Sequence, residues 1–179
     1  MTAAWRVMLL FTLLTCSLAA TADVPLGHRA VAEAEGVPAS VLYAVAMTES
    51  GAAFESGKRN PWPWSLNVEG RTLRYRTRVE TWRALNTLLA KGVTRVDIGL
   101  MQVSWAYHRE ALGDPWKALD PYHNLRVGAA ILRAQFQATG DWWQAVGRYH
   151  APNHAERAHR YRARVVTWYR RIAVEGLPG

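Results

Sequence analysis

Most of this 179-residue chain consists of short apolar segments at helical spacing, each opened by proline or a capping residue and closed by glycine. Pro25 and Pro38 open the first two segments, and Gly36 and Gly51 close them. Proline is favoured at the start of a helix and glycine just after its end. The pattern therefore predicts two helices in close succession, and its continuation along the chain predicts a mainly α fold.

The second segment contains four apolar residues that fall along one side of a helix, Val41, Leu42, Val45 and Ala46. This spacing predicts one buried stripe. Residues 52–65 are rich in glycine, asparagine, proline and tryptophan, which predicts a loop. The segments 65–68 and 73–76 then flank Glu69-Gly70, a weak signal for a turn, so we expect a small β-hairpin near residues 65–76.

Capping residues place the next helix. Thr77 and Glu80 have the spacing of a capping box, and Gly92 ends the helix that they start. One face of this helix is apolar, consisting of Trp82, Leu85, Leu88 and Leu89. The segment therefore predicts an amphipathic helix that packs on the core.

Three helices are predicted in the last third of the chain. Asp120 is the expected N-cap of a helix that Gly140 ends, with Leu125, Ala129 and Leu132 inward. A short helix follows over residues 141–149 and a long one over residues 155–174. The apolar face of the long helix consists of Ala158, Tyr161, Val165, Trp168 and Ile172.

The N-terminus has the form of a secretory signal peptide. Arg6 precedes an apolar run over residues 7–14, and small residues continue to Ala22. We expect residues 1–22 to be removed and residues 23–179 to form one domain in the periplasm. A retained membrane anchor is the alternative, but the run is shorter than the ~20 apolar residues that span a bilayer. Lipidation of Cys16, the single cysteine, is a further alternative.

The formal net charge is +8, and arginine is concentrated between residues 148 and 171. This balance favours an acidic partner, namely nucleic acid, anionic lipid or another anionic polymer. The alternative is a solvated basic helix face without a partner. Because no segment combines basic residues with the interleaved aromatics of a nucleic-acid module, we expect no nucleic-acid partner.

Glu49 is the leading candidate for a catalytic group. It lies in the last turn of an apolar helix, where unpaired carbonyl groups leave a partial negative charge that disfavours a second one. Apolar surroundings would raise the carboxyl pKa further by desolvation. A carboxylic acid that is still protonated near neutrality can act as a general acid, whereas the alternative is an ordinary surface glutamate.

Glu49-Ser50 is followed by three further motifs, in the order Gly99–Gln102, Asp120–Leu132 and Tyr149-His150. The ordered set resembles the soluble lytic transglycosylases, whose fold is that of goose-type lysozyme. The resemblance covers nearly all of residues 23–179. It implies a helical, lysozyme-like SLT domain that acts on the glycan strands of peptidoglycan.

The resemblance also implies roles for individual residues. Glu49 would be the single acid and base, and Ser50 would help to set its carboxyl group. Gln102 would bind an N-acetylated sugar, and Tyr149 would bind Glu49 or the substrate acetamido group. Met101 would be a wall of the groove, although an apolar residue in this run is more often part of the core. No metal or cofactor is implied.

The implied reaction cleaves the MurNAc-GlcNAc β-1,4 bond and closes a 1,6-anhydro ring on the muramic acid. Asp97 leaves an alternative open, because it could position a water and make the enzyme a hydrolase. The other interpretation is that Asp97 caps the Gly99–Gln102 turn. A peptidoglycan-binding module with an idle site is the remaining alternative.

His150, His154 and His159 suggest a metal cluster at first sight, but no acidic ligand accompanies them, so we expect no zinc site. Trp62, Trp64 and Trp105 could stack on sugars or belong to the core.

The third motif departs from the family pattern. Tyr149-His150-Ala151-Pro152 stands where Tyr-Asn-Ala-Gly is common. The variant is similar to small specialised transglycosylases of conjugation and of type III and type IV secretion systems. It implies a monomeric enzyme that opens the cell wall locally for a secretion, pilus or conjugation apparatus.

Overall fold

The computed structural model describes residues 24–54 and 59–175. The expected signal peptide, its cleavage after Ala22 and the lipidation of Cys16 fall outside the described residues and stay predictions. Within the described part, no single helix is long and apolar enough to cross a membrane. The pair Leu26–Glu35 and Ala39–Ser50 passes that test only when taken together, across a bend of 118°.

The described chain is mainly α, as expected. Its helices are α1 (Leu26–Glu35), α2 (Ala39–Ser50), α3 (Arg78–Ala90), α4 (Trp105–Leu112), α5 (Pro115–Ala118), α6 (Pro121–Thr139), α7 (Trp142–His150) and α8 (Ala155–Glu175). The strands are β1 (Gly51–Ala53), β2 (Arg59–Pro61), β3 (Ser65–Val68), β4 (Arg71–Arg74), β5 (Val96–Ile98) and β6 (Val103–Ser104).

Thr77 and Asp120 act as N-caps as predicted, but the reciprocal contact of the capping box at Thr77 is not formed. The Thr77 side chain accepts a hydrogen bond from the backbone N–H of Glu80, and Asp120 accepts one from the N–H of His123. The Glu80 carboxylate accepts from the N–H of Arg76 rather than from that of the capping residue. Gly140 ends α6 in the left-handed conformation that glycine adopts without steric cost.

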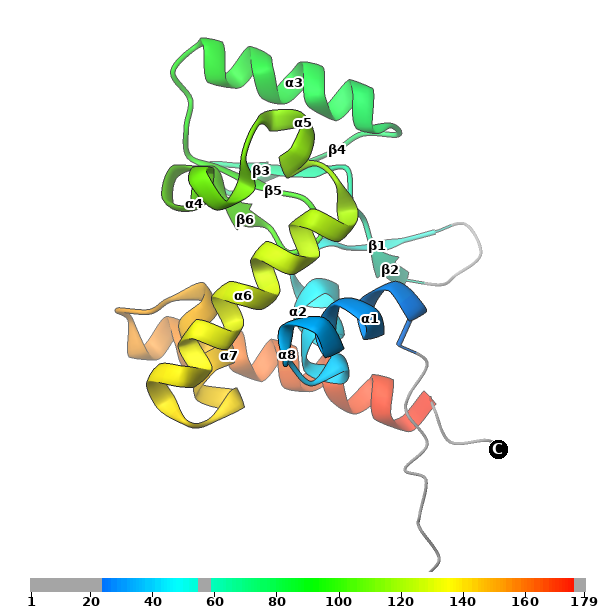
Figure 1. The fold of residues 1–179 in the computed structure, drawn as a ribbon, viewed down its shortest axis with the longest axis vertical. Helices are drawn as coiled ribbons and strands as arrows, with labels where there is room; N and C mark the ends of the chain where they lie inside the picture. Colours follow the sequence, from blue (N-terminus) through cyan, green and yellow to red (C-terminus); the bar gives the residue numbers. More distant parts are fainter. Residues whose placement is uncertain (1–23, 55–58, 176–179) are drawn as a thin grey trace, which may run out of the picture.

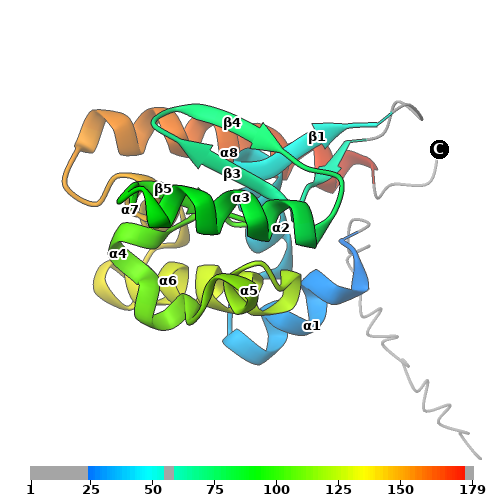
Figure 2. The ribbon, with the colours of Figure 1, turned by 90° about the horizontal axis from the view of Figure 1, so that it is seen from above.

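The molecule has two parts that α6 joins (Figure 1). One part contains α1, α2, α7 and α8, and the other contains the strands β3 to β6 with α3, α4 and α5. Helix α6 contacts α1 and α7 on one side and α4, α5 and β6 on the other. From above, α8 lies on the opposite side of the molecule from α5 and α6 (Figure 2).

Helix α2 is buried on every side, so the prediction of a single buried stripe is wrong. Every residue from Val41 to Met47 is buried, because α1, α8 and β2 pack around the helix. A helix that is apolar all round is stable only in the centre of a domain. The helix therefore runs from the middle of the protein to the surface of a groove, and Glu49 lies at its C-terminal end there.

The β structure is larger than expected. The hairpin of β3 and β4 is confirmed, with Glu69 and Gly70 both at positive φ in its turn. This conformation is preferred in two-residue hairpin turns because its twist matches that of the strands. Strands β5 and β6 were not predicted, and they extend the sheet to the order β4-β3-β5-β6.

The predicted loop over residues 52–65 is also partly wrong, because β1 and β2 pair antiparallel within it. Gly51 ends α2, but at φ −52° rather than in the left-handed region. Its role is steric. A Cβ at this position would lie 2.4 Å from the carbonyl oxygen of Met47. Because glycine has no Cβ, the chain can turn at Gly51 from α2 into β1.

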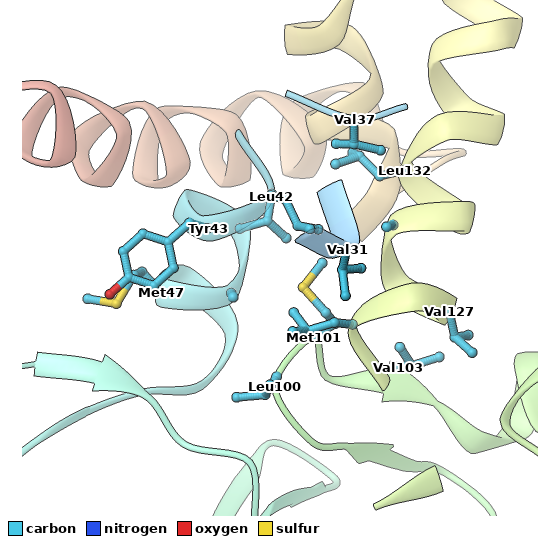
Figure 3. Close-up of a cluster of buried hydrophobic side chains, with 14 of the residues drawn as sticks. Val31, Val37, Leu42, Tyr43, Met47, Leu100, Met101, Val103, Val127 and Leu132 are labelled. Atoms are coloured by element: carbon cyan, nitrogen blue, oxygen red, sulfur yellow. The ribbon is translucent and has the colours of Figure 1, made fainter. Parts of the chain in front are cut away.

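The core brings the Gly99–Gln102 turn against α6. Met101 is fully buried and belongs to the same cluster of side chains as Val31 and Leu42 (Figure 3). Gly128 of α6 faces it, and a Cβ at this glycine would lie 2.6 Å from both Cβ and Cγ of Met101. The close approach of turn and helix therefore requires glycine.

Gly128→Ala should lower stability, because the added methyl group meets the inflexible base of the Met101 side chain. Overpacking costs about 1–3 kcal/mol, which outweighs the helix propensity gained. We expect a melting temperature lower by roughly 2–8 °C. Gln137→Ala, at an exposed position of the same helix, should change the free energy of unfolding by less than about 0.5 kcal/mol. An unchanged melting temperature for Gly128→Ala would show that the turn can move away from the helix.

Candidate active site

A groove of about 1060 Å³ runs across the end of α2, between the β5–β6 strands and the α7–α8 connection. Glu49 and Asp97 are the carboxylates that line it, and Gln102 and Tyr149 line it as well. Its other charged lining residues are basic, and they are Arg74, Arg148, Arg157 and Arg164. The groove thus combines two acids with a positively charged wall.

Glu49 has the properties predicted for a general acid. The pKa of its carboxyl group is raised to about 7, chiefly by burial; the Tyr161 hydrogen bond and Arg164 lower this pKa, and the nearby Asp97 raises it. Desolvation disfavours the charged form of a carboxyl group, which is why burial is the largest influence. Near neutral pH the side chain is therefore present in both its protonated and its ionised form. A residue that first gives and then takes a proton needs both forms.

Tyr161 of α8 holds the Glu49 carboxyl group in place. Its hydroxyl donates a hydrogen bond of 2.5 Å to Oε1 of Glu49. The Tyr161 ring stacks on the ring of His150, with centroids 4.5 Å apart and planes 3° apart. The guanidinium of Arg164 lies 5.4 Å from the centre of the same ring. The sequence placed Tyr161 in the apolar face of its helix and gave no sign of this contact.

The Gly99–Gln102 turn is organised by Asn124, a buried side chain of α6. Its Oδ1 accepts from the backbone N–H of Met101 at 2.9 Å, and its Nδ2 donates to the carbonyl oxygen of Ile98 at 2.9 Å. Gly99 has φ 78°, and a Cβ there would lie 2.7 Å from the Asn124 amide. Buried amides must be hydrogen-bonded, so this pair fixes the position of the turn on α6.

Gln102 lies at the end of this turn with a positive φ of 45°, which is strained for a residue with a Cβ. Its Nε2 donates to the carbonyl oxygen of Gly99 at 2.8 Å and to Oγ of Ser65 at 3.1 Å. The side chain lines the groove as expected. Its amide hydrogens, however, are already directed toward the protein.

Met101 does not line the groove. The buried side chain packs on α6, in agreement with the core alternative, and only its backbone carbonyl takes part in the site. Tyr149 donates a 2.7 Å hydrogen bond to that carbonyl oxygen. The Tyr149 hydroxyl is therefore hydrogen-bonded to the turn, and burial and then the nearby Glu49 and Asp97 raise its pKa well above the usual value.

Ser50 is buried beside Glu49 in the chain but points elsewhere. Its Oγ donates to the carbonyl oxygen of Leu100 at 2.8 Å. Ser50 therefore connects the end of α2 to the Gly99–Gln102 turn. It can set the carboxyl group of Glu49 through this connection and not by a direct contact.

Asp97 lies in the groove, and its side chain does not cap the Gly99–Gln102 turn, which was the other interpretation of this residue. It belongs to β5, pairs across the strands with Asn67 and Ser104, and accepts a hydrogen bond from the Ser104 side chain. Burial raises its pKa, whereas the Ser104 bond lowers it. The alternation of side chains along the strand turns Asp97 toward the groove, and Asn124 takes the role of organising the turn instead.

The remaining candidates are three histidines and three tryptophans. Among the described residues, no group of three or more His, Cys, Asp or Glu side chains could hold a metal ion. His150 and His154 line the groove, and His159 does not. Trp62 and Trp64 contact each other at 5.3 Å outside the groove lining, and Trp105 is buried.

Comparison with known families agrees with this geometry. The profile of the transglycosylase SLT domain matches residues 28–168. The chain belongs to the transglycosylase SLT domain family. Membership supports a function of the peptidoglycan lytic transglycosylase type, with peptidoglycan as the substrate. No curated protein and no solved structure gives a significant match.

The environment of Glu49 in this SLT domain predicts two opposite pKa changes. Tyr161→Phe should raise the pKa of Glu49, because the lost hydrogen bond stabilises the charged form. Asp97→Asn should lower it, because a nearby negative charge is removed. A carboxyl ¹³C NMR titration of each purified variant measures both shifts without any substrate. Shifts in the same direction would show that the two contacts do not act on Glu49 as the structure indicates.

Proposed function

We propose that this protein is a lytic transglycosylase that cleaves the MurNAc-GlcNAc β-1,4 bond of peptidoglycan and forms 1,6-anhydroMurNAc. The observation that carries the proposal is Glu49, a carboxyl group with a pKa of about 7 at the surface of a groove in an SLT domain. Export to the periplasm by the N-terminal segment is part of the same proposal, as is action as a monomer.

Bond cleavage begins with proton transfer from Glu49. Tyr161 occupies Oε1, so Oε2 carries the proton toward the glycosidic oxygen. The bond from C1 of MurNAc to that oxygen breaks, its electron pair stays on the oxygen, and the proton completes the new hydroxyl group of GlcNAc. The carbonyl oxygen of the MurNAc acetamido group stabilises the positive charge left at C1.

The second step closes the anhydro ring. Glu49, now ionised, takes the proton from the C6 hydroxyl of the same MurNAc, and the C6 oxygen attacks C1. This returns Glu49 to its protonated form without consuming water. An intramolecular nucleophile that is already close to C1 reacts faster than a separate molecule would. Gln102 and Tyr149 line the groove where the N-acetylated sugars would lie.

Hydrolysis is the second candidate, and the position of Asp97 favours it specifically. A second carboxylate in the groove can position a water for attack on C1, as inverting glycosidases require. The product would then be reducing-end MurNAc instead of the anhydro sugar. Mass spectrometry of fragments released from purified murein sacculi separates the two reactions. Anhydro products alone are expected, and reducing ends alone would identify a hydrolase.

Glu49→Gln should abolish cleavage, because general acid catalysis contributes about 10²–10⁴-fold to such rates. The variant should fold, since glutamine fills the same volume and its carbonyl oxygen can still accept from Tyr161. Sacculus digestion at equal thermal stability is the measurement, with Gln137→Ala as the control. Activity within a few fold of wild type would remove Glu49 from the mechanism. Binding to sacculi without release by the wild-type protein would instead favour a non-catalytic module.

We further propose that the enzyme opens the wall locally for a secretion, pilus or conjugation apparatus. The Tyr149-His150 variant supports this role through its similarity to the specialised transglycosylases of such systems. The basic surface of α8 supports it because a basic surface favours an acidic partner. Deletion should reduce transfer or secretion while cell shape and total muropeptide release stay unchanged. Normal transfer with a bulk loss of released anhydro-muropeptides would assign the enzyme to general murein turnover.

A further inference from the structure

The histidine of the Tyr149-His150 motif makes a contact that the proposed reaction does not use. His150 is the last residue of α7 and stands where the family pattern commonly has asparagine. Its ring lies parallel to the Tyr161 ring, with planes 3° apart and centroids 4.5 Å apart. Tyr161 in turn donates the 2.5 Å hydrogen bond to Oε1 of Glu49. The three side chains therefore form one connected series that ends at the carboxyl group of Glu49.

The close packing of α7 and α8 brings the two rings together. A Cβ at Gly147 of α7 would lie 3.0 Å from the carbonyl oxygen of Ala158 of α8. His150 and Tyr161 each come three residues after this contact, so each lies on the same face of its helix as the contact residue. Tyr161 is 1% exposed, whereas His150 is exposed and lines the groove. The imidazole therefore covers one face of a buried ring with a side chain that reaches the groove.

The plane of a tyrosine ring decides where its hydroxyl hydrogen points. The phenolic oxygen lies on the axis about which the ring turns, so turning the ring leaves this oxygen in place. The O–H bond prefers the ring plane, because the oxygen is conjugated with the ring, and the hydrogen therefore turns with the ring. The last side-chain torsion of tyrosine has a broad energy minimum, so neighbouring groups set the plane. A stacked imidazole can do so at Tyr161, because aromatic pairs have a preferred geometry.

The charged groups that act on His150 are the guanidiniums of Arg164 and Arg157, both on α8. Burial, followed by Arg164 and then Arg157, lowers the pKa of the His150 imidazole below its usual value. The imidazole is therefore neutral at the pH near 7 at which Glu49 changes its charge. Its influence on Glu49 thus comes from the contact with Tyr161 and not from a charge of its own. An uncharged aromatic ring should be able to replace it.

We propose that His150 is a positioning residue, whose stacked ring sets the plane of the Tyr161 ring and so directs the Tyr161 hydroxyl at Oε1 of Glu49. Oε2 is then the oxygen left to face the glycosidic oxygen of the substrate. The consequence for cleavage rests on the proposed function, whereas the effect on Glu49 does not. Because asparagine has no ring to stack, the departure of this chain from the family pattern has a physical reason.

The first test is a carboxyl ¹³C NMR titration of Glu49 in the free protein. His150→Ala should raise the pKa of Glu49, because a Tyr161 hydroxyl that points elsewhere no longer stabilises the carboxylate. In a Tyr161→Phe background the same substitution should change nothing, because the group through which His150 acts is absent. His150→Phe should keep the wild-type titration, because it restores a flat ring.

The second test measures kcat and KM on soluble glycan chains. His150→Ala should lower kcat about two- to tenfold, the range of one aromatic pair, and leave KM unchanged. The fall of kcat at alkaline pH should move to higher pH, because Glu49 with a raised pKa stays protonated there. His150→Phe should restore kcat. His159→Ala is the matched control, since it removes an exposed imidazole outside the groove lining, and it should change neither kcat nor the titration of Glu49.

A rise in KM at unchanged kcat would show that His150 contacts the sugar instead, and would overturn the positioning role. An unchanged pKa of Glu49 in His150→Ala would overturn it, and so would a change that persists without the Tyr161 hydroxyl. The titration needs no substrate, so this inference and the proposed function can fail separately. The expected pKa changes in a protein that releases no glycan fragment would refute the function alone. Normal cleavage without those changes would refute the positioning role alone.

Discussion

The burial of α2 on every side is the constraint from which the rest of the structure follows. Its apolar surface must be covered by α1, α8 and β2, and this requirement brings the first and last described helices together around one helix. The helix then ends at the groove, and its last turn carries Glu49. The carboxyl group of Glu49 is thus placed where the protein interior removes water from it, which raises its pKa.

The carboxyl group of Glu49 is balanced by contacts from three elements. Burial in α2 and the charge of Asp97 on β5 raise its pKa, and Tyr161 and Arg164 on α8 lower it. A value near 7 is useful for one residue that acts first as an acid and then as a base. Because Arg157 and Arg164 of α8 also line the groove, the same helix adjusts the pKa of Glu49 and supplies part of the basic wall.

Packing and hydrogen bonding together hold the Gly99–Gln102 turn in its position. Asn124 fixes the turn by its amide, and Gly128 allows Met101 to approach α6. Ser50 donates to the backbone of the same turn, and so does Tyr149. The motifs that suggested the family are therefore mostly structural partners of one another. They keep Gln102 and Glu49 at fixed positions on the groove.

The sequence by itself predicted six of the eight helices among the described residues, because proline, glycine and capping side chains act on the backbone within a few residues; it did not predict α4 and α5. It also made Glu49 the leading candidate for a catalytic group, because the Glu49-Ser50 step stands first in an ordered set of motifs that resembles the soluble lytic transglycosylases. Only the tertiary structure decided that Tyr161 binds Glu49, that Asp97 faces the groove, and that β1, β5 and β6 form strands. These features depend on contacts between residues far apart in the chain, 112 positions in the case of Tyr161 and Glu49. Short strands and a buried tyrosine have no local signal, because their partners are chosen by the packing of the whole domain.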